Sequence, residues 1–133
     1  MLIDNSMIRS TRKILKLRRM LNMAGDFKTA LVSYAALAAR NHGRAAALAG
    51  SMYLMGTGVR ENGVKAMKYL EIGKNAGDLD AISLLGLAYA TGKSGIRIDY
   101  IKARPLLEAA AKIGDEKALQ MLQLMKSRQK SRR

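Results

Sequence analysis

Apolar residues recur along most of the chain with the spacing of α-helices. In residues 44–55 and 80–90 they fall three or four positions apart, which gives each predicted helix one apolar face. Two glycine-rich segments follow these stretches, Gly56-Thr57-Gly58 and Gly92-Lys93-Ser94-Gly95, and such segments end helices and turn the chain. The pattern predicts an all-α protein whose short helices are joined by tight turns.

The pattern repeats after 36 residues, and a fixed period of this length determines the architecture. Four positions of one unit return in the same order in the next: Ala45, Gly50, Tyr53 and Gly56 return as Ala81, Gly86, Tyr89 and Gly92. Second helices are predicted at 66–76 and 103–113, with Asn62 and Asp99 as their N-caps. The repeat predicts a right-handed α/α solenoid of about three helix-turn-helix repeats plus a C-terminal capping helix.

Two glycines lie inside the predicted first helices, where a glycine costs roughly 1 kcal/mol relative to alanine. They are Gly50 and Gly86, at the same position of successive repeats. Because the cost recurs, we expect a neighbouring helix to cross each glycine too closely for a side chain.

We expect one domain over residues 1–125, with repeats at about 7–41, 42–77 and 78–114 and a capping helix at 115–126. A basic tail is expected at 127–133. The first repeat is predicted to turn at Met23-Ala24-Gly25-Asp26. Arg18 and Gln123 stand where the other units carry the crossing glycine, which predicts a terminal cap at each end of the solenoid.

The recurring glycine, tyrosine and alanine positions, with Ala-Gly-Asp at 76–78 and Ile-Gly-Asp at 113–115, resemble the Sel-one-like repeat family of the tetratricopeptide superfamily. The resemblance covers roughly residues 41–122. It implies a stack of helical hairpins without enzymatic activity. It also implies an adaptor that assembles protein complexes, often in bacterial signalling or secretion.

The net charge of +14 is concentrated at the two ends of the chain. Residues 1–19 hold six Lys or Arg and one acid, and residues 7–21 predict a basic amphipathic helix. A charged solenoid cap is the alternative explanation for this helix. The residues predicted to contact a partner are Arg9, Arg12, Lys13, Lys16, Arg19, Arg40, Arg44 and Met55.

Two functions remain open at this point. The first is a non-enzymatic adaptor or scaffold that binds a protein or peptide with an acidic surface through the helical-repeat groove and the basic N-terminal helix. The alternative is sequence-independent nucleic-acid binding through the basic N-terminal helix and the C-terminal tail, whose phosphate contacts are predicted to come from Lys126, Arg128, Lys130, Arg132 and Arg133. A membrane surface is a weaker choice, because the apolar face of the first helix is needed to pack on residues 30–39.

The residue types present argue against catalysis, metal binding and nucleotide binding. The chain has no cysteine, and its only histidine, His42, is predicted to lie in a loop. Gly92-Lys93-Ser94 resembles the end of a phosphate-binding loop, but Leu87 stands where that motif needs a glycine. We therefore expect no enzyme, metal, cofactor or small-molecule substrate. The cysteine-free sequence and the absence of a recognisable secretory signal or transmembrane stretch predict a cytoplasmic protein.

Overall fold

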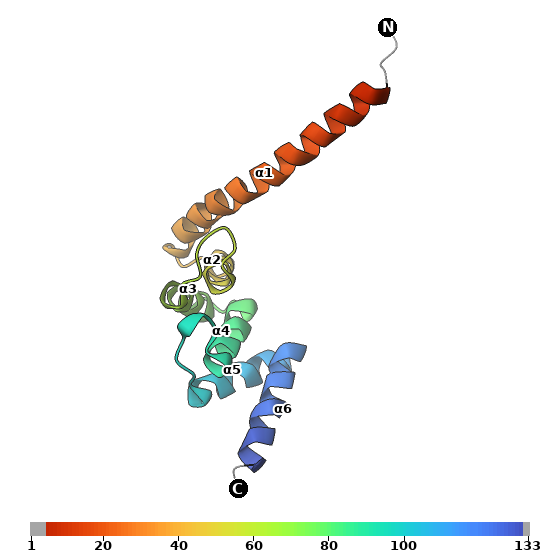
Figure 1. Ribbon diagram of the computed structural model, residues 1–133. Coiled ribbons are helices and arrows are strands. Elements are labelled where there is room, and N and C mark those ends of the chain that lie inside the picture. Colours follow the sequence, from red (N-terminus) through yellow and green to blue (C-terminus); the bar gives the residue numbers. More distant parts are fainter. Residues whose placement is uncertain (1–4, 132–133) are drawn as a thin grey trace.

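A computed structural model describes the backbone of residues 5–131 and the side chains of residues 9, 11–13 and 26–129. In this range the secondary structure consists of helices joined by short turns and loops, and no strand occurs. Their order is α1 (Asn5–Ala38), α2 (Gly43–Met55), α3 (Gly63–Asn75), α4 (Leu79–Thr91), the 3₁₀ turn η1 (Lys93–Gly95), α5 (Tyr100–Lys112) and α6 (Glu116–Ser131). Figure 1 shows α2 to α6 stacked one after another, with the two termini at opposite ends. The predicted all-α helical repeat solenoid is confirmed.

Each complete repeat is a pair of antiparallel helices, α2 with α3 and α4 with α5. The first helix of each pair ends at a glycine with a left-handed backbone, Gly56 (φ 72°) after α2 and Gly92 (φ 71°) after α4. A residue with a side chain is strained in this conformation, so glycine is the residue suited to these turns. Helix α6 packs against both α5 and α4, as the first helix of a further unit after α4 and α5 would.

Side-chain caps begin the second helices where the sequence predicts them. The Lys65 backbone amide donates to the Asn62 side chain over 3.0 Å, and the Lys102 amide donates to the Asp99 side chain over 3.1 Å. Each bond satisfies one amide that the first turn of a helix leaves without an internal partner. The first helices are capped in the same way, α4 by Asp78 and α2 by His42.

The two crossing glycines lie against leucines of the second helices. A β-carbon at Gly50 would come within 2.7 Å of the Leu70 side chain, and one at Gly86 within 3.0 Å of the Leu107 side chain. Both leucines are fully buried. The predicted close helix crossing is therefore confirmed, and it occurs between the two helices of one repeat.

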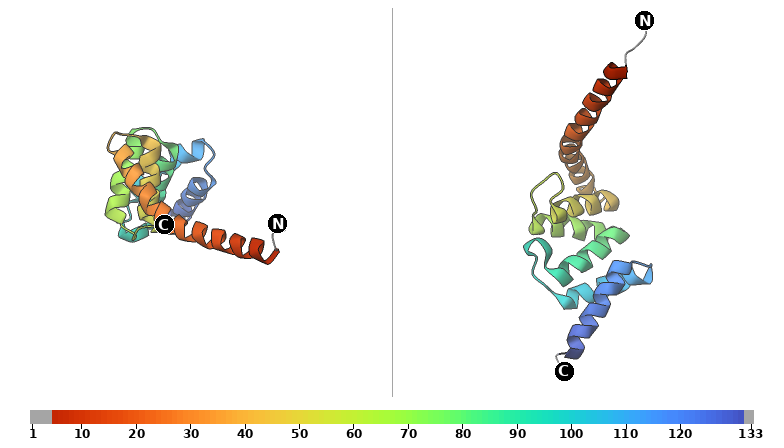
Figure 2. Two further views of the ribbon diagram at one scale, coloured as in Figure 1. Left: turned by 90° about the horizontal axis from the view of Figure 1, so that it is seen from above. Right: turned by 45° about the vertical axis from the view of Figure 1, so that its right-hand side comes forward.

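The predicted turn at Met23-Ala24-Gly25-Asp26 is wrong, because α1 is continuous from Asn5 to Ala38. The other connections between first and second helices contain two glycines with positive φ, Gly56 and Gly58 in one and Gly92 and Gly95 in the other. The turn predicted in the first unit contains a single glycine, Gly25, and its methionine and alanine favour a helix. The N-terminal half of α1 consequently projects from the stack (Figure 2).

The predicted tail at 127–133 also needs correction. Helix α6 does not end at residue 126 but continues to Ser131. Lysine, arginine and glutamine favour a helix, and neither glycine nor proline interrupts this stretch. The basic residues Lys126 and Arg128 therefore occupy a helix surface.

Candidate partner-binding groove

A groove of about 330 Å³ lies between α2, α4 and the start of α6. Its apolar lining comes from two pairs of residues, Leu48 and Met55 on α2 and Leu84 and Leu87 on α4. Leu48 and Leu84 are 36 residues apart, so they hold the same position in successive repeats. Met55 is 54% exposed, which leaves its flexible thioether available to a partner. The groove is thus a product of the repeat.

Charged residues of alternating sign follow the groove at one repeated position. Arg44 on α2, Asp80 on α4 and Lys117 on α6 are separated by 36 and 37 residues, and all three line the groove. The Arg44 guanidinium donates to Asp80 Oδ2 and forms an ion pair that joins α2 to α4. This hydrogen bond, followed by the charge of Asp80, raises the pKa of Arg44 above its ordinary value.

A hydrogen bond between side chains joins α4 to the beginning of α6. The hydroxyl of the buried Ser83 donates to Asp115 Oδ2, while Asp115 Oδ1 accepts from the Ala118 amide over 3.1 Å and caps α6. The Ser83 bond is the largest cause that lowers the pKa of the Asp115 carboxyl, against the opposing effect of desolvation. Both residues line the groove, so this hydrogen bond fixes the position of α4 relative to the start of α6 in the groove wall.

The structure brings only part of the predicted contact set into the groove. Arg44 and Met55 line it. Arg9, Arg12 and Lys13 are exposed on the projecting half of α1, and Arg40 is exposed just after α1 ends. The side chains of Lys16 and Arg19 lie outside the described residues.

Sequence reasoning missed several groove residues, among them Leu48, Asp80, Ser83, Leu84, Leu87, Asp115 and Lys117. The repeat itself contained a usable signal, because Asp80 and Lys117 follow from Arg44 by one and two periods. Ser83 and Asp115 carried no such signal, since their contact joins different repeat positions on α4 and before α6.

The segment that resembles a phosphate-binding loop serves to connect the two repeats. Lys93 Nζ lies 3.0 Å from Glu61 Oε1, and the Ser94 hydroxyl donates to the Leu54 carbonyl oxygen over 2.8 Å. Hydrogen bonds from Lys93 and Ser94 lower the pKa of the Glu61 carboxyl. These contacts join the loop after α4 to the loop after α2, and they account for the Lys-Ser pair without a nucleotide.

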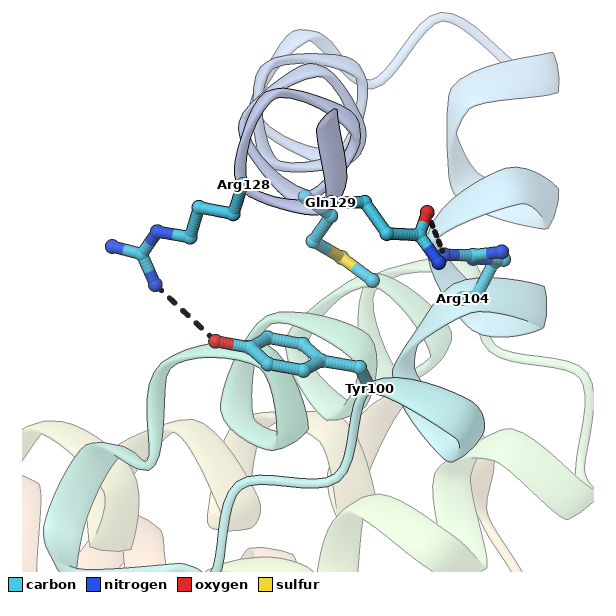
Figure 3. Close-up of a pocket in the computed structure, with 5 residues that line it drawn as sticks. Tyr100, Arg104, Arg128 and Gln129 are labelled. Carbon is cyan, nitrogen blue, oxygen red and sulfur yellow. Dashed lines mark hydrogen bonds between the residues drawn. The ribbon is translucent and has the colours of Figure 1, made fainter. Parts of the chain in front are cut away.

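A second cavity, of about 190 Å³, lies between α5 and α6 (Figure 3). Arg128 donates to the Tyr100 hydroxyl over 3.2 Å, and Arg104 donates to the Gln129 side chain over 3.4 Å. In Figure 3 the two guanidinium groups extend to opposite sides of the cavity, so they do not converge on a common point. Lys126 is exposed on the same helix. The Lys130 side chain and residues Arg132 and Arg133 lie outside the described residues.

The described part of the chain offers neither a metal site nor a membrane-spanning helix. There, no three His, Asp or Glu residues are grouped as metal ligands. His42 is used as a helix cap, because its Nδ1 accepts from the Ala45 amide over 3.1 Å. No helix within the described range combines the length and the apolar character needed to cross a bilayer.

The profile of the Sel1 repeat matches residues 43–78 and 79–115 of the chain, which is more than half of its length. The chain belongs to the Sel1 repeat family. The matched ranges contain α2 with α3 and α4 with α5, the two complete helix pairs of the stack. Comparison with curated proteins gave no match. Sel1 repeats generally mediate protein–protein interaction and are typically non-catalytic modules.

Proposed function

We propose that this Sel1 repeat chain is a non-enzymatic adaptor that binds a segment of another protein in the groove between α2, α4 and α6. The observation that carries the proposal is the apolar lining of Leu48, Met55, Leu84 and Leu87, in a groove of about 330 Å³. An apolar groove along parallel helices accommodates the apolar face of a peptide or helix, and binding of this kind needs no catalytic group.

The exposed cations outside the groove support a partner that carries acidic groups beside its apolar residues, because the charges of the lining itself balance, Arg44 and Lys117 against Asp80 and Asp115. Arg44 is already paired with Asp80, so Lys117 and the exposed cations Arg9, Arg12 and Lys13 of α1 are the groups that would attract it. Attraction between exposed charges raises the association rate more than the affinity, and salt weakens it. We expect the apolar lining to supply most of the binding free energy.

A substitution that introduces charge into the groove tests this proposal. Met55→Glu places a carboxylate among the apolar side chains at an exposed position, so the fold should be preserved. We expect the partner captured from native cells by the unmodified chain to be lost, with affinity at least tenfold lower. Val64→Glu is the matched control, because Val64 is 84% exposed on α3 and does not line the groove. Equal capture by both variants would exclude the groove as the binding site.

The nucleic-acid alternative has less support from the arrangement of charge. The two basic segments belong to α1 and α6, which lie at opposite ends of the stack (Figure 1). A phosphate backbone is bound best by cations that follow one continuous path. A gel-shift assay at low salt tests the alternative, and a complex that is lost on removing residues 126–133 would favour it over the adaptor.

The cytoplasmic location expected from the cysteine-free sequence stays a prediction. An adaptor of this kind would meet its partner there. Fractionation of native cells, with the chain detected by an antibody, measures the location directly.

A further inference from the structure

Helix α1 has an incompletely covered side at positions that are buried in the two complete repeats. Ala66 and Ala103 are fully buried between the first helices of their own and the following unit, whereas the equivalent Ala30 is partly exposed. Ala110 is 1% exposed, whereas the equivalent Leu37 is 40% exposed. The second half of α1 thus corresponds to α3 and α5, the second helices of the complete repeats, but no first helix of its own unit packs against it.

The helix that would cover this side is encoded in the same chain. Leu17 and Leu21 stand at the places of Leu85 and Tyr89, so residues 7–21 carry the pattern of a first helix. That segment cannot fold back in this structure, because α1 is continuous through residues 22–26. Residues 15 and 37 of one straight helix are roughly 33 Å apart at about 1.5 Å per residue.

We propose that two copies of the chain pair through antiparallel α1 helices, each copy supplying residues 7–21 to cover the open side of the other's second half. This exchange of an element between copies is a domain swap, which completes the first repeat of both chains. It extends the helix pairing seen between α2 and α3 and between α4 and α5 by one further pair at the end of the stack.

The register of the pairing follows from the complete repeats. On α2 and α3, Gly73 faces Ala47, because a β-carbon on Gly73 would lie 3.4 Å from the Ala47 amide nitrogen, and Leu70 faces Gly50. These two facing pairs define the antiparallel register of the helices. The same register in the first unit sets Leu15 of one copy opposite Leu37 of the other. These two leucines replace the small pair Ala47 and Gly73. The pairing thus gives the half-exposed Leu37 an apolar partner.

The charges of α1 distinguish this pairing from the binding of an acidic partner. Residues 9–19 carry six cations, Arg9, Arg12, Lys13, Lys16, Arg18 and Arg19, and the register sets them opposite residues 33–43 of the other copy, where the one charged residue, Arg40, repels them. Salt screens this repulsion, so the dimer should tighten when sodium chloride is raised from about 0.05 to about 0.5 M. A complex with an acidic partner should weaken over the same range.

Disulfide trapping tests the pairing, because the native chain has no cysteine. We expect the double variant Leu15→Cys and Leu37→Cys to form a disulfide-linked dimer under mild oxidation. The combination Leu15→Cys and Val64→Cys is the control, since Val64 is exposed on α3 and takes no part in the proposed pairing, and it should stay unlinked. A disulfide within one chain, which would mean a closed hairpin, or no selective disulfide would overturn the proposal.

The mass in solution gives an independent measurement that needs no substitution. Light scattering of the unmodified full chain at about 100 μM should give twice the 14.5 kDa of one chain. Insertion of four glycine and serine residues between Ala24 and Gly25 lets the hairpin close within one chain, so dimerisation should weaken at least tenfold. A monomeric native chain at this concentration, or a dimer unchanged by the insertion, would contradict the exchange.

Discussion

Gly50 on α2 lies directly against Leu70 on α3, so close that a β-carbon there would be 2.7 Å from the leucine side chain. Leu70 is fully buried and lies in a core cluster with Ala47, Ala81 and Leu85. It therefore cannot move aside without disturbing its neighbours. The contact sets the distance between α2 and α3 and explains why a glycine occupies the middle of α2.

Gly50→Ala should consequently destabilise the fold. Overpacking against Leu70 outweighs the roughly 1 kcal/mol by which alanine favours a helix, and we expect a net loss of about 1–2 kcal/mol in the free energy of unfolding. Urea unfolding followed by circular dichroism measures it. Gly86→Ala is the matched control, because its β-carbon would lie 3.0 Å from Leu107 and smaller shifts relieve the contact. An equal or larger loss at Gly86 would contradict this explanation.

Ser83→Ala should destabilise the protein in a pH-dependent manner. Ser83 donates to Asp115 and thereby lowers the pKa of that carboxyl in the folded state. A lowered folded pKa gives stability that is present above the unfolded pKa of about 4 and is lost as the pH falls through the folded value. We expect the variant to lose about 1–2 kcal/mol at pH 7 and less near pH 2.

The control for this pH dependence is an Asp115→Asn background, which keeps a residue able to cap α6 but removes the titrating charge. In that background the effect of Ser83→Ala should be the same at both pH values. Unfolding curves of the four chains at each pH decide the matter. A Ser83→Ala effect that does not change with pH in the native background would refute the assignment.

Asp99→Ala should lower the free energy of unfolding by about 1 kcal/mol, because the Lys102 amide then loses its acceptor at the start of α5. Asp99→Asn should be nearly neutral, since asparagine is an equally good N-cap. Thermal unfolding of the two variants checks this. Equal losses in both would show that the negative charge of Asp99, and not its capping hydrogen bond, stabilises the helix.

Arg44→Ala should separate stability from binding. The Arg44 and Asp80 side chains are 56% and 64% exposed, and exposed ion pairs contribute about 0–1 kcal/mol. We therefore expect a small change in unfolding free energy but a measurable loss of partner affinity, because the Asp80 carboxylate is then left unpaired in the proposed groove and repels an acidic partner. Chemical unfolding and partner titration on the same preparation measure both. A large loss of stability with unchanged affinity would argue against the role given to Arg44.

Local chemistry explains which parts of the fold were predictable. The glycine crossings at Gly50 and Gly86 and the caps at Asn62 and Asp99 depend on residue types that serve one geometric purpose and recur in register. The hairpin turn at 23–26 was predicted wrongly, because closing a turn depends on what the flanking helices can bury. The end of α6 was predicted wrongly for a similar reason, since basic charge alone does not end a helix.

The sequence by itself determined the period, the helix pairs and the close crossings, because these follow from patterns that repeat every 36 or 37 residues. Only the tertiary structure decided that Arg44 meets Asp80, that Ser83 bonds Asp115 and that α1 is one continuous helix. The first two contacts join residues 36 and 32 positions apart. The path of α1 depends on whether a turn or a continuous helix at residues 23–26 has the lower free energy. Such outcomes are set by packing between elements, which no single stretch of residues specifies.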